Sequence, residues 1–148
     1  MGMACAQPPT PGPTDDVPLR GAWRVIERSY VRGDSSWTEA DPAPGLYLFG
    51  RSYYGVQEIR ESGRRALFDE ATTDLERLAA FDVFHAHAGR YETTDTTLTI
   101  VPEVAKSPNS MDGRATTYVY ALDGDRLTIT RRAPVDRELR TTVLVRLE

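Results

Sequence analysis

The sequence has a single cysteine, Cys5, in 148 residues. One cysteine excludes an intramolecular disulfide and a zinc site built from cysteines. No apolar run approaches the ~18 residues that a membrane-spanning helix requires, so we expect no membrane span. The net charge is −4, with acidic and basic residues interspersed. This balance argues against nucleic acid or an anionic membrane as partner, because both bind basic patches.

Sequence motifs of several enzyme and cofactor classes are also missing. There is no Gly-x-Ser-x-Gly, no His-Glu-x-x-His and no glycine-rich phosphate loop. The two histidines, His85 and His87, point apart if they lie on a helix. On an extended segment both would point the same way, and a metal would still need a third ligand such as Asp82. We therefore expect no metal and no cofactor.

The residues that are present suffice for one folded domain. Hydrophobic residues make up 40% of the chain and charged residues 27%, which is ordinary for a soluble globular protein. Residues 1–18 carry four prolines between Pro8 and Pro13 and no hydrophobic period. We predict a disordered, proline-rich tether over residues 1–18 and the folded domain over residues 19–148.

The start of the chain leaves two localisations open. Ala4-Cys5, followed by the proline-rich segment, resembles the processed end of a bacterial lipoprotein, but the apolar segment that should precede such a cysteine is missing. The protein is then either an exported or cell-envelope lipoprotein that lacks its signal segment, or a cytoplasmic protein.

Most of the folded domain has the period of two that is typical of β-strands. In residues 21–31, Trp23, Val25 and Glu27 fall on one face, and the other face carries Ala22, Arg24, Ile26 and Arg28. Gly21 would let the backbone come close where the indole of Trp23 plugs one end. Seven more strands are predicted at residues 46–49, 53–59, 90–93, 97–101, 116–122, 126–130 and 141–147. Asp123-Gly124 between two of them is a strong hairpin signal.

Two segments break this pattern. Residues 32–44 are predicted as loop, in which Trp37 either covers the mouth of the fold or packs on its outer wall. Thr73 and Glu76 form a capping box, and apolar residues at helical spacing follow. We predict one helix over residues 74–88, interrupted near Asp82, with Gly89 as its C-terminal cap.

Eight sequential antiparallel strands predict an all-β fold, an eight-stranded up-and-down β-barrel with one short helix. Closure removes the exposed edge that an apolar last strand would otherwise leave. The interior of such a barrel holds side chains or one small ligand.

Several blocks of the sequence resemble the bacterial lipocalin-like domain family. They are the Gly-x-Trp at residues 21–23 and residues 45–49, 74–81, 88–92, 101–109 and 122–128. The resemblance spans about residues 19–131 and implies an eight-stranded calycin barrel, similar in fold to lipocalins, which often encloses a small apolar molecule. It also implies a structural role for Arg146, which would cover the ring of Trp23 from the last strand.

Candidate ligand-binding residues are the aromatic and charged residues of the predicted strands and their ends. They are Tyr47, Phe49, Tyr54, Val56, Glu58, Glu103, Lys106, Tyr118 and Tyr120. Facing inward, the aromatic residues would line a cavity with apolar surface and a few hydroxyl groups. They would otherwise cover the outer wall or fill a closed core. The charged residues would stand at the barrel mouth or form a solvated rim.

The expected function is the binding or carriage of a small hydrophobic molecule inside the barrel. A first alternative is an isomerase or cyclase in which Glu58, Glu103 or Lys106 moves a proton within the same pocket. A second alternative is a closed barrel without ligand that serves as an interaction module.

Overall fold

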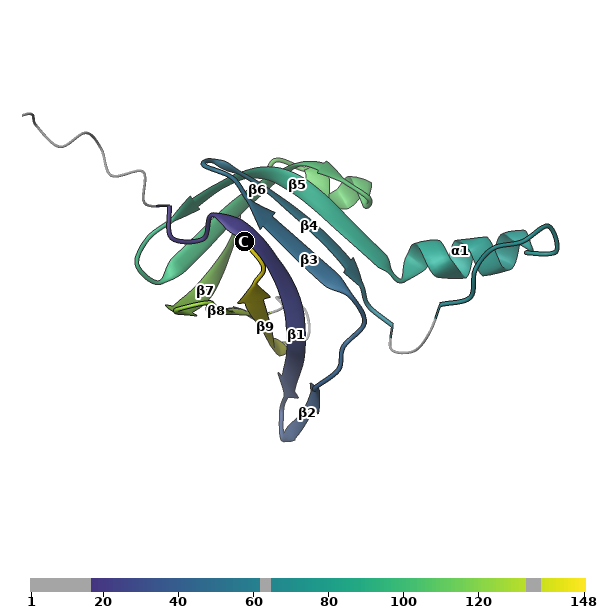
Figure 1. Ribbon diagram of the computed structural model, residues 1–148, viewed down its shortest axis with the longest axis horizontal. Helices are drawn as coiled ribbons and strands as arrows, with labels where there is room; N and C mark the ends of the chain where they lie inside the picture. Colours follow the sequence, from purple (N-terminus) through teal and green to yellow (C-terminus); the bar gives the residue numbers. More distant parts are fainter. Residues whose placement is uncertain (1–16, 62–64, 133–136) are drawn as a thin grey trace, which may run out of the picture.

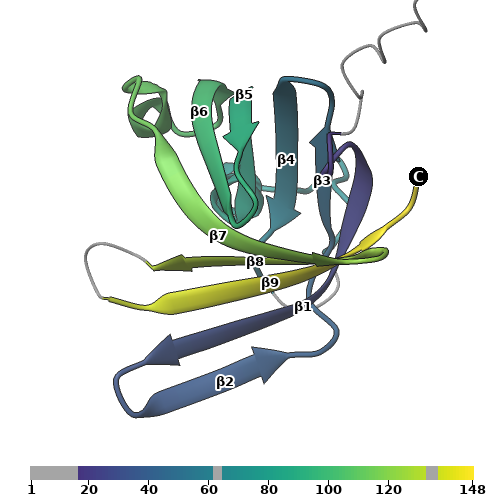
Figure 2. The same cartoon turned by 90° about the vertical axis from the view of Figure 1, so that its left-hand side faces the viewer.

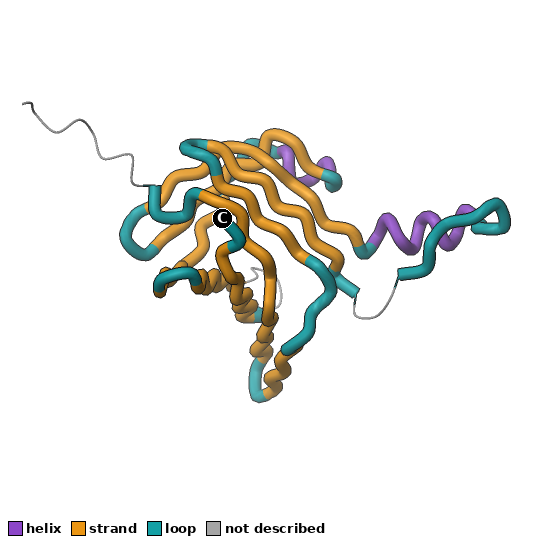
Figure 3. Tube along the Cα trace, viewed as in Figure 1, coloured by secondary structure: helices purple, strands orange, loops and turns teal. Residues whose placement is uncertain are grey.

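The computed structural model describes residues 17–61, 65–132 and 137–148. Nearly all of the tether predicted over residues 1–18, including Cys5, lies outside the described residues. The described part contains nine strands, one α-helix and one 3-10 helix, and strands make up most of it (Figure 3).

The elements follow the chain in the order β1 (Gly21–Arg32), β2 (Ser35–Glu39), β3 (Gly45–Phe49), β4 (Tyr53–Ile59), α1 (Asp74–Asp82), β5 (Phe84–Thr93), β6 (Thr97–Ala105), η1 (Pro108–Met111), β7 (Thr116–Asp123), β8 (Arg126–Arg132) and β9 (Leu139–Arg146). The Asp123-Gly124 hairpin is present, with Asp123 opposite Arg126 and Gly124 at φ 57°.

The sheet closes on itself. Its strand order is β2-β1-β3-β4-β5-β6-β7-β8-β9, and β1 also pairs with β9, so β1 and β3 to β9 form a ring of eight antiparallel strands. In Figure 2, β3 to β6 form the upper wall, and β7, β8, β9 and β1 form the lower wall. The predicted fold class, an eight-stranded antiparallel barrel with one helix, is confirmed.

One end of the barrel is sealed around Trp23, which is fully buried. Its indole nitrogen Nε1 donates to the carbonyl of Leu19 at 2.7 Å. The guanidinium carbon of Arg146 lies 4.1 Å from the centre of the Trp23 ring, and its Nη1 and Nη2 donate to the carbonyls of Arg20 at 2.5 Å and Pro18 at 3.3 Å. These contacts tie the segment before β1 to the end of β9.

Gly21 allows the backbone to approach closely at this sealed end. Its φ is +131°, and a Cβ there would come within 2.1 Å of the carbonyl oxygen of Glu148. Only glycine tolerates both conditions. The close backbone approach expected at Gly21 is therefore present.

A β-bulge interrupts the pairing of β1 with β9. Val25 lies opposite Leu144 and Glu27 opposite Val143, so Ile26 is the extra residue on β1. An extra residue shifts the alternation of faces by one position. Arg28 therefore enters the barrel interior, where it is 3% exposed. The simple alternation that placed Glu27 on the face of Trp23 and Arg28 on the opposite face is corrected beyond this point.

The helix is shorter than predicted. Its capping box is present, with the Thr73 side chain accepting from the amide of Glu76, but α1 ends at Asp82 and β5 starts at Phe84. Residues 84–88 are held in the strand by pairing with β4, and Gly89 pairs with Tyr54 instead of capping a helix. No residue of α1 is buried, and the helix extends away from the barrel (Figure 1). In the described ranges, no helix combines the length and apolar character needed to cross a membrane.

The predicted loop over residues 32–44 contains β2, which forms a hairpin with the second half of β1. Trp37 on β2 lies opposite Tyr30 and stacks on it, with ring centroids 5.0 Å apart and planes 13° apart. Trp37 remains 44% exposed. The stack anchors the hairpin to the barrel strand.

The seal around Trp23 generates a stability prediction. Replacing Arg146 by Gln removes the cation–π contact and the donors to Arg20 and Pro18, and we expect the free energy of unfolding to fall by about 2 kcal/mol. Arg24→Gln on the exposed face of β1 is the matched control and should change it by less than about 0.5 kcal/mol. Urea denaturation measures both. Equal effects of the two variants would contradict the structural role of Arg146.

Candidate functional site

The barrel encloses a cavity of about 390 Å³. Its apolar lining comes from five strands and consists of Phe49, Val56, Leu98, Ile100 and Ile129, joined by the rings of Tyr47, Tyr54 and Tyr118. Most of these residues also belong to the buried core, which continues from the cavity to Trp23. The core thus fills one end of the barrel, and the cavity occupies the rest.

The inward side chains become more polar toward the open end of the barrel. From the sealed end to the open end, the inward side chains of β4 are Tyr54, Val56 and Glu58, followed by Arg60 just beyond the strand. In the same direction, β8 presents Leu127, Ile129 and Arg131. On β9, which runs the opposite way, the inward side chains are Leu144, Thr142 and Arg140. Leu127 and Leu144 are fully buried near the sealed end. The cavity therefore has an apolar floor and a charged upper wall.

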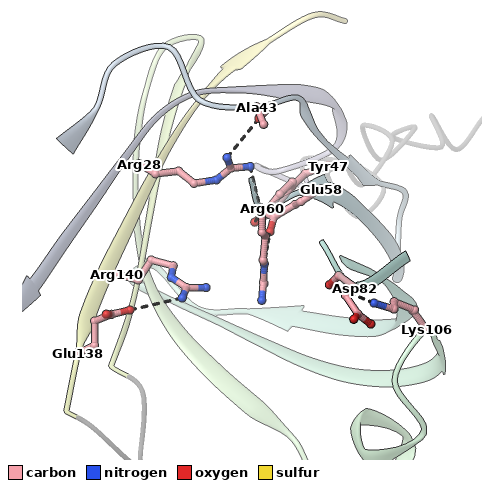
Figure 4. A network of polar contacts seen from close by, with 9 residues as sticks. All are labelled: Arg28, Ala43, Tyr47, Glu58, Arg60, Asp82, Lys106, Glu138 and Arg140. Carbon is pink, nitrogen blue, oxygen red and sulfur yellow. Dashed lines mark hydrogen bonds and ion pairs between the residues drawn. The ribbon is translucent and has the colours of Figure 1, made fainter. Parts of the chain in front are cut away.

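Glu58 is the acidic centre of this charged wall and is 4% exposed. The Tyr47 hydroxyl donates to its Oε1, Arg60 Nε donates to its Oε2 at 3.1 Å, and Arg28 Nη2 lies 4.0 Å from Oε1 (Figure 4). Burial raises the pKa of Glu58, but Arg60, the Tyr47 hydrogen bond and Arg28 outweigh it and hold that pKa below its usual value. Burial and the Glu58 carboxylate raise the pKa of Tyr47 well above its ordinary value. The pair is a carboxylate bound by a neutral phenol.

His85 and His87 both face the cavity, because β5 is extended where a helix was predicted. Their ring centroids lie 5.0 Å apart, and Tyr54 Oη lies 2.8 Å from His87 Nδ1. Burial, reinforced by the charge of Arg60, lowers the pKa of each histidine to about 4. Both rings are therefore neutral at pH 7. The described residues contain no group of three potential ligands that would hold a metal ion.

Arg28 reaches the cavity because the neighbouring strand leaves it room. A Cβ on Gly45 would lie 3.0 Å from Arg28 Nη2 and 2.7 Å from Val25 Cγ2, so a larger residue at the start of β3 would displace the guanidinium. Arg28 Nη1 donates to the carbonyl of Ala43 at 3.2 Å. The position of this cation is thus determined by two segments of the chain, β1 and residues 43–45.

The structure brings six of the nine candidate ligand-binding residues to the cavity wall: Tyr47, Phe49, Tyr54, Val56, Glu58 and Tyr118. The other three do not line the cavity. Glu103 pairs with Arg90 at 2.7 Å on the exposed outer face. Tyr120 is buried in the core, and its hydroxyl donates to the carbonyl of Thr94 at 2.8 Å.

Lys106 is placed at the end of α1 instead of at the cavity. Its Nζ donates to the carbonyl of Phe81 and, at 3.3 Å, to that of Asp82, and it lies 4.1 Å from the centre of the Phe81 ring. Carbonyls at a helix C-terminus have no partner within the helix, and a cation there is favourable. Lys106 therefore caps α1.

Sequence reasoning missed the arginines of the cavity wall, namely Arg28, Arg114, Arg131 and Arg140. Two of them could have been found from the sequence pattern. Arg131 and Arg140 lie two residues from Ile129 and Thr142 and therefore share their inward face. Arg28 could not have been found in this way, because the bulge at Ile26 reverses its face.

The order and closure of the strands identify the type of fold. Eight antiparallel strands follow one another around a closed ring, and a tryptophan near the start of the first strand is covered by an arginine of the last. The chain has a lipocalin-like fold.

Among solved structures, a lipocalin-like protein from Bacteroides uniformis is similar, with 12% sequence identity, a TM-score of 0.48, and coverage of 87% of this chain and 98% of that one. An uncharacterized protein from Bacteroides eggerthii shows 11% identity and a TM-score of 0.45 over 86% of this chain and 98% of that one. No family model and no curated protein matches the sequence.

The neutral histidines of the lipocalin-like barrel predict a pH effect. Their pKa of about 4 in the folded state lies below the unfolded value of about 6.5. Between these values the unfolded chain binds more protons, so their contribution to stability is full above about pH 6.5 and is lost as the pH falls toward 4. Replacing both His85 and His87 by Gln should weaken this pH dependence.

The measurement is the free energy of unfolding of both proteins across this range. The carboxylates titrate in both proteins, so the difference between the two curves isolates the histidines. If the free energy of unfolding varied with pH in the same way in both proteins, the lowered pKa of the two histidines would be contradicted.

Proposed function

We propose that the lipocalin-like barrel binds a small molecule with a hydrophobic body inside its cavity. The observation that supports this most is the cavity of about 390 Å³ with one apolar end. Ligand pockets have volumes of about 300–1,000 Å³ and combine apolar walls with a few placed polar groups. This cavity has both features.

Apolar burial would supply most of the affinity. Each Å² of apolar ligand surface removed from water contributes about 25 cal/mol. The walls at the apolar end are already ordered by the core, since Phe49, Val56 and Leu98 are each less than 6% exposed. Binding therefore requires little further ordering of side chains, so the entropic cost that opposes the contact energy is small.

The interaction-module alternative requires inward side chains that meet without a void. The cavity speaks against it, because Tyr118, Ile100 and Ile129 face an open volume instead of one another. The apolar wall is more consistent with a bound molecule than with a surface for protein docking.

The catalytic alternative has weaker support. Of the three residues considered for proton transfer, Glu58 alone lines the cavity. Its carboxylate already accepts from Tyr47 and Arg60, and its lowered pKa makes it a weak base. The arrangement favours holding a ligand over moving a proton.

A pair of valine substitutions tests the proposed function. Val56→Phe projects into the cavity, and Val119→Phe adds the same side chain on the exposed face of β7. Titration with the neutral apolar fluorophore 1-aminoanthracene should give at least about tenfold weaker binding for Val56→Phe and no change for Val119→Phe. Urea denaturation verifies that both variants remain folded.

Native mass spectrometry of the protein purified from its own source provides the complementary measurement. A retained small molecule in the wild-type protein that is lost in Val56→Phe would support the proposal. Failure of the fluorophore to bind the wild-type protein, or equal binding by both variants, would contradict it.

A further inference from the structure

Arg28 carries a buried donor that nothing in the described ranges satisfies. The residue is 3% exposed and lines the cavity. Its Nη1 donates to the carbonyl of Ala43, but among the described residues Nη2 has no hydrogen-bond partner, and the nearest carboxylate oxygen, Glu58 Oε1, is 4.0 Å away. A buried guanidinium N–H without a partner is unfavourable unless a ligand completes it.

Arg140 presents a second donor of this kind. Within the described ranges its buried Nε has no hydrogen-bond partner, while its Nη2 donates to Glu138 at 3.4 Å. Its guanidinium carbon lies 5.2 Å from the centre of the Tyr30 ring, and the residue lines the cavity. Arg140 is thus held in place by Glu138 and Tyr30 and is only partly satisfied.

The two arginines are neighbours on one wall. Arg28 on β1 lies opposite Thr142, and Arg140 on β9 lies opposite Tyr30, so the two arginines are diagonal partners on the inward face. Diagonal partners on paired strands are about 7–8 Å apart and within reach of long side chains. Figure 4 shows the guanidinium groups of Arg28, Arg140 and Arg60 directed toward the same interior space. Like charges on neighbouring positions repel each other. Among the described residues no carboxylate pairs with both Arg28 and Arg140, since Glu58 lies 4.0 Å from Arg28 and Glu138 lies 3.4 Å from Arg140.

The charge of the whole cavity has the same sign. The described residues that line it include five arginines, Arg28, Arg60, Arg114, Arg131 and Arg140, and two acidic residues, Glu58 and Asp112. The chain as a whole has a net charge of −4. Arg60 and Arg114 pair with these acids at 3.1 and 3.5 Å. The cavity is therefore locally cationic in an acidic protein.

We propose that the ligand is an amphipathic anion whose carboxylate lies between Arg28 Nη2 and Arg140 Nε and whose apolar chain extends toward Phe49 and Ile100. The proposal rests on the proposed function, because it assigns the polar end of a ligand bound in the same cavity. A carboxylate accepts several N–H donors at once and forms its strongest hydrogen bonds with guanidinium groups. It would satisfy both orphan donors and neutralise the repulsion between them.

Three ten-carbon probes with the same tail test the head group. Isothermal calorimetry at neutral pH would compare decanoate, the neutral 1-decanol and the cationic decyltrimethylammonium, each below its aggregation concentration. We expect decanoate to bind at least about tenfold more tightly than 1-decanol, and the cation to bind most weakly. Equal affinities of decanoate and 1-decanol would overturn the proposal.

Arginine variants locate the head group. Arg28→Gln and Arg140→Gln should each weaken decanoate binding about tenfold or more while leaving 1-decanol within about threefold. Arg90→Gln, on the outer face beside Glu103, is the matched control and should change neither affinity. Because Arg28 also holds Ala43, thermal unfolding verifies each variant, and Arg140→Gln tests the head group independently of that contact. An equal loss in Arg90→Gln, or no loss in either cavity variant, would overturn the proposal.

The outcomes separate this inference from the proposed function. If 1-decanol and 1-aminoanthracene bind and decanoate has no advantage, the cavity is an apolar binding site and the anionic head group is wrong. If none of the probes binds, the proposed function fails and the head-group assignment fails with it.

Discussion

The pairing of β1 with β9 is the constraint on which the rest of the structure depends. It closes the ring of strands and brings Arg146 over Trp23, which seals one end of the barrel. The bulge within the same pairing shifts the alternation at Ile26 and turns Arg28 inward. A regular pairing would instead face Glu27 toward the interior and replace a cation by an anion. The same strand pairing therefore closes the barrel and turns one of the five cavity arginines inward.

The interior of the barrel combines two environments. Near the sealed end the walls are apolar, and toward the open end they carry guanidinium, carboxylate and imidazole groups. Burying charge is unfavourable unless it is paired. Glu58 receives its partners from Tyr47 and Arg60, whereas Arg28 keeps a donor without one. A site that is ordered but incompletely satisfied is suited to a ligand with an apolar body and one charged end.

Much of the barrel could be predicted from the sequence, and the errors have identifiable physical causes. The eight barrel strands were recognisable because alternation and turn residues are local features. Residues 84–88 were assigned to the helix since Phe84, His85 and Ala88 also fit helical spacing, and pairing with β4 decided otherwise. The candidate site was predicted from aromatic, apolar and charged residues of the strands and their ends, and six of those nine residues line the cavity. Most of the arginines were overlooked because a charged residue on a strand usually faces water.

The sequence by itself determined the class of fold and the order of the barrel strands, because side-chain period and turn chemistry are properties of short segments and their order. The contact between Trp23 and Arg146 was implied by the resemblance to the bacterial lipocalin-like domain family. Only the tertiary structure decided that β5 is extended, that Lys106 caps a helix and that Arg28 faces the cavity. Each of these depends on pairing between segments distant in the chain, and a one-residue shift in such a pairing reverses which side chains face inward.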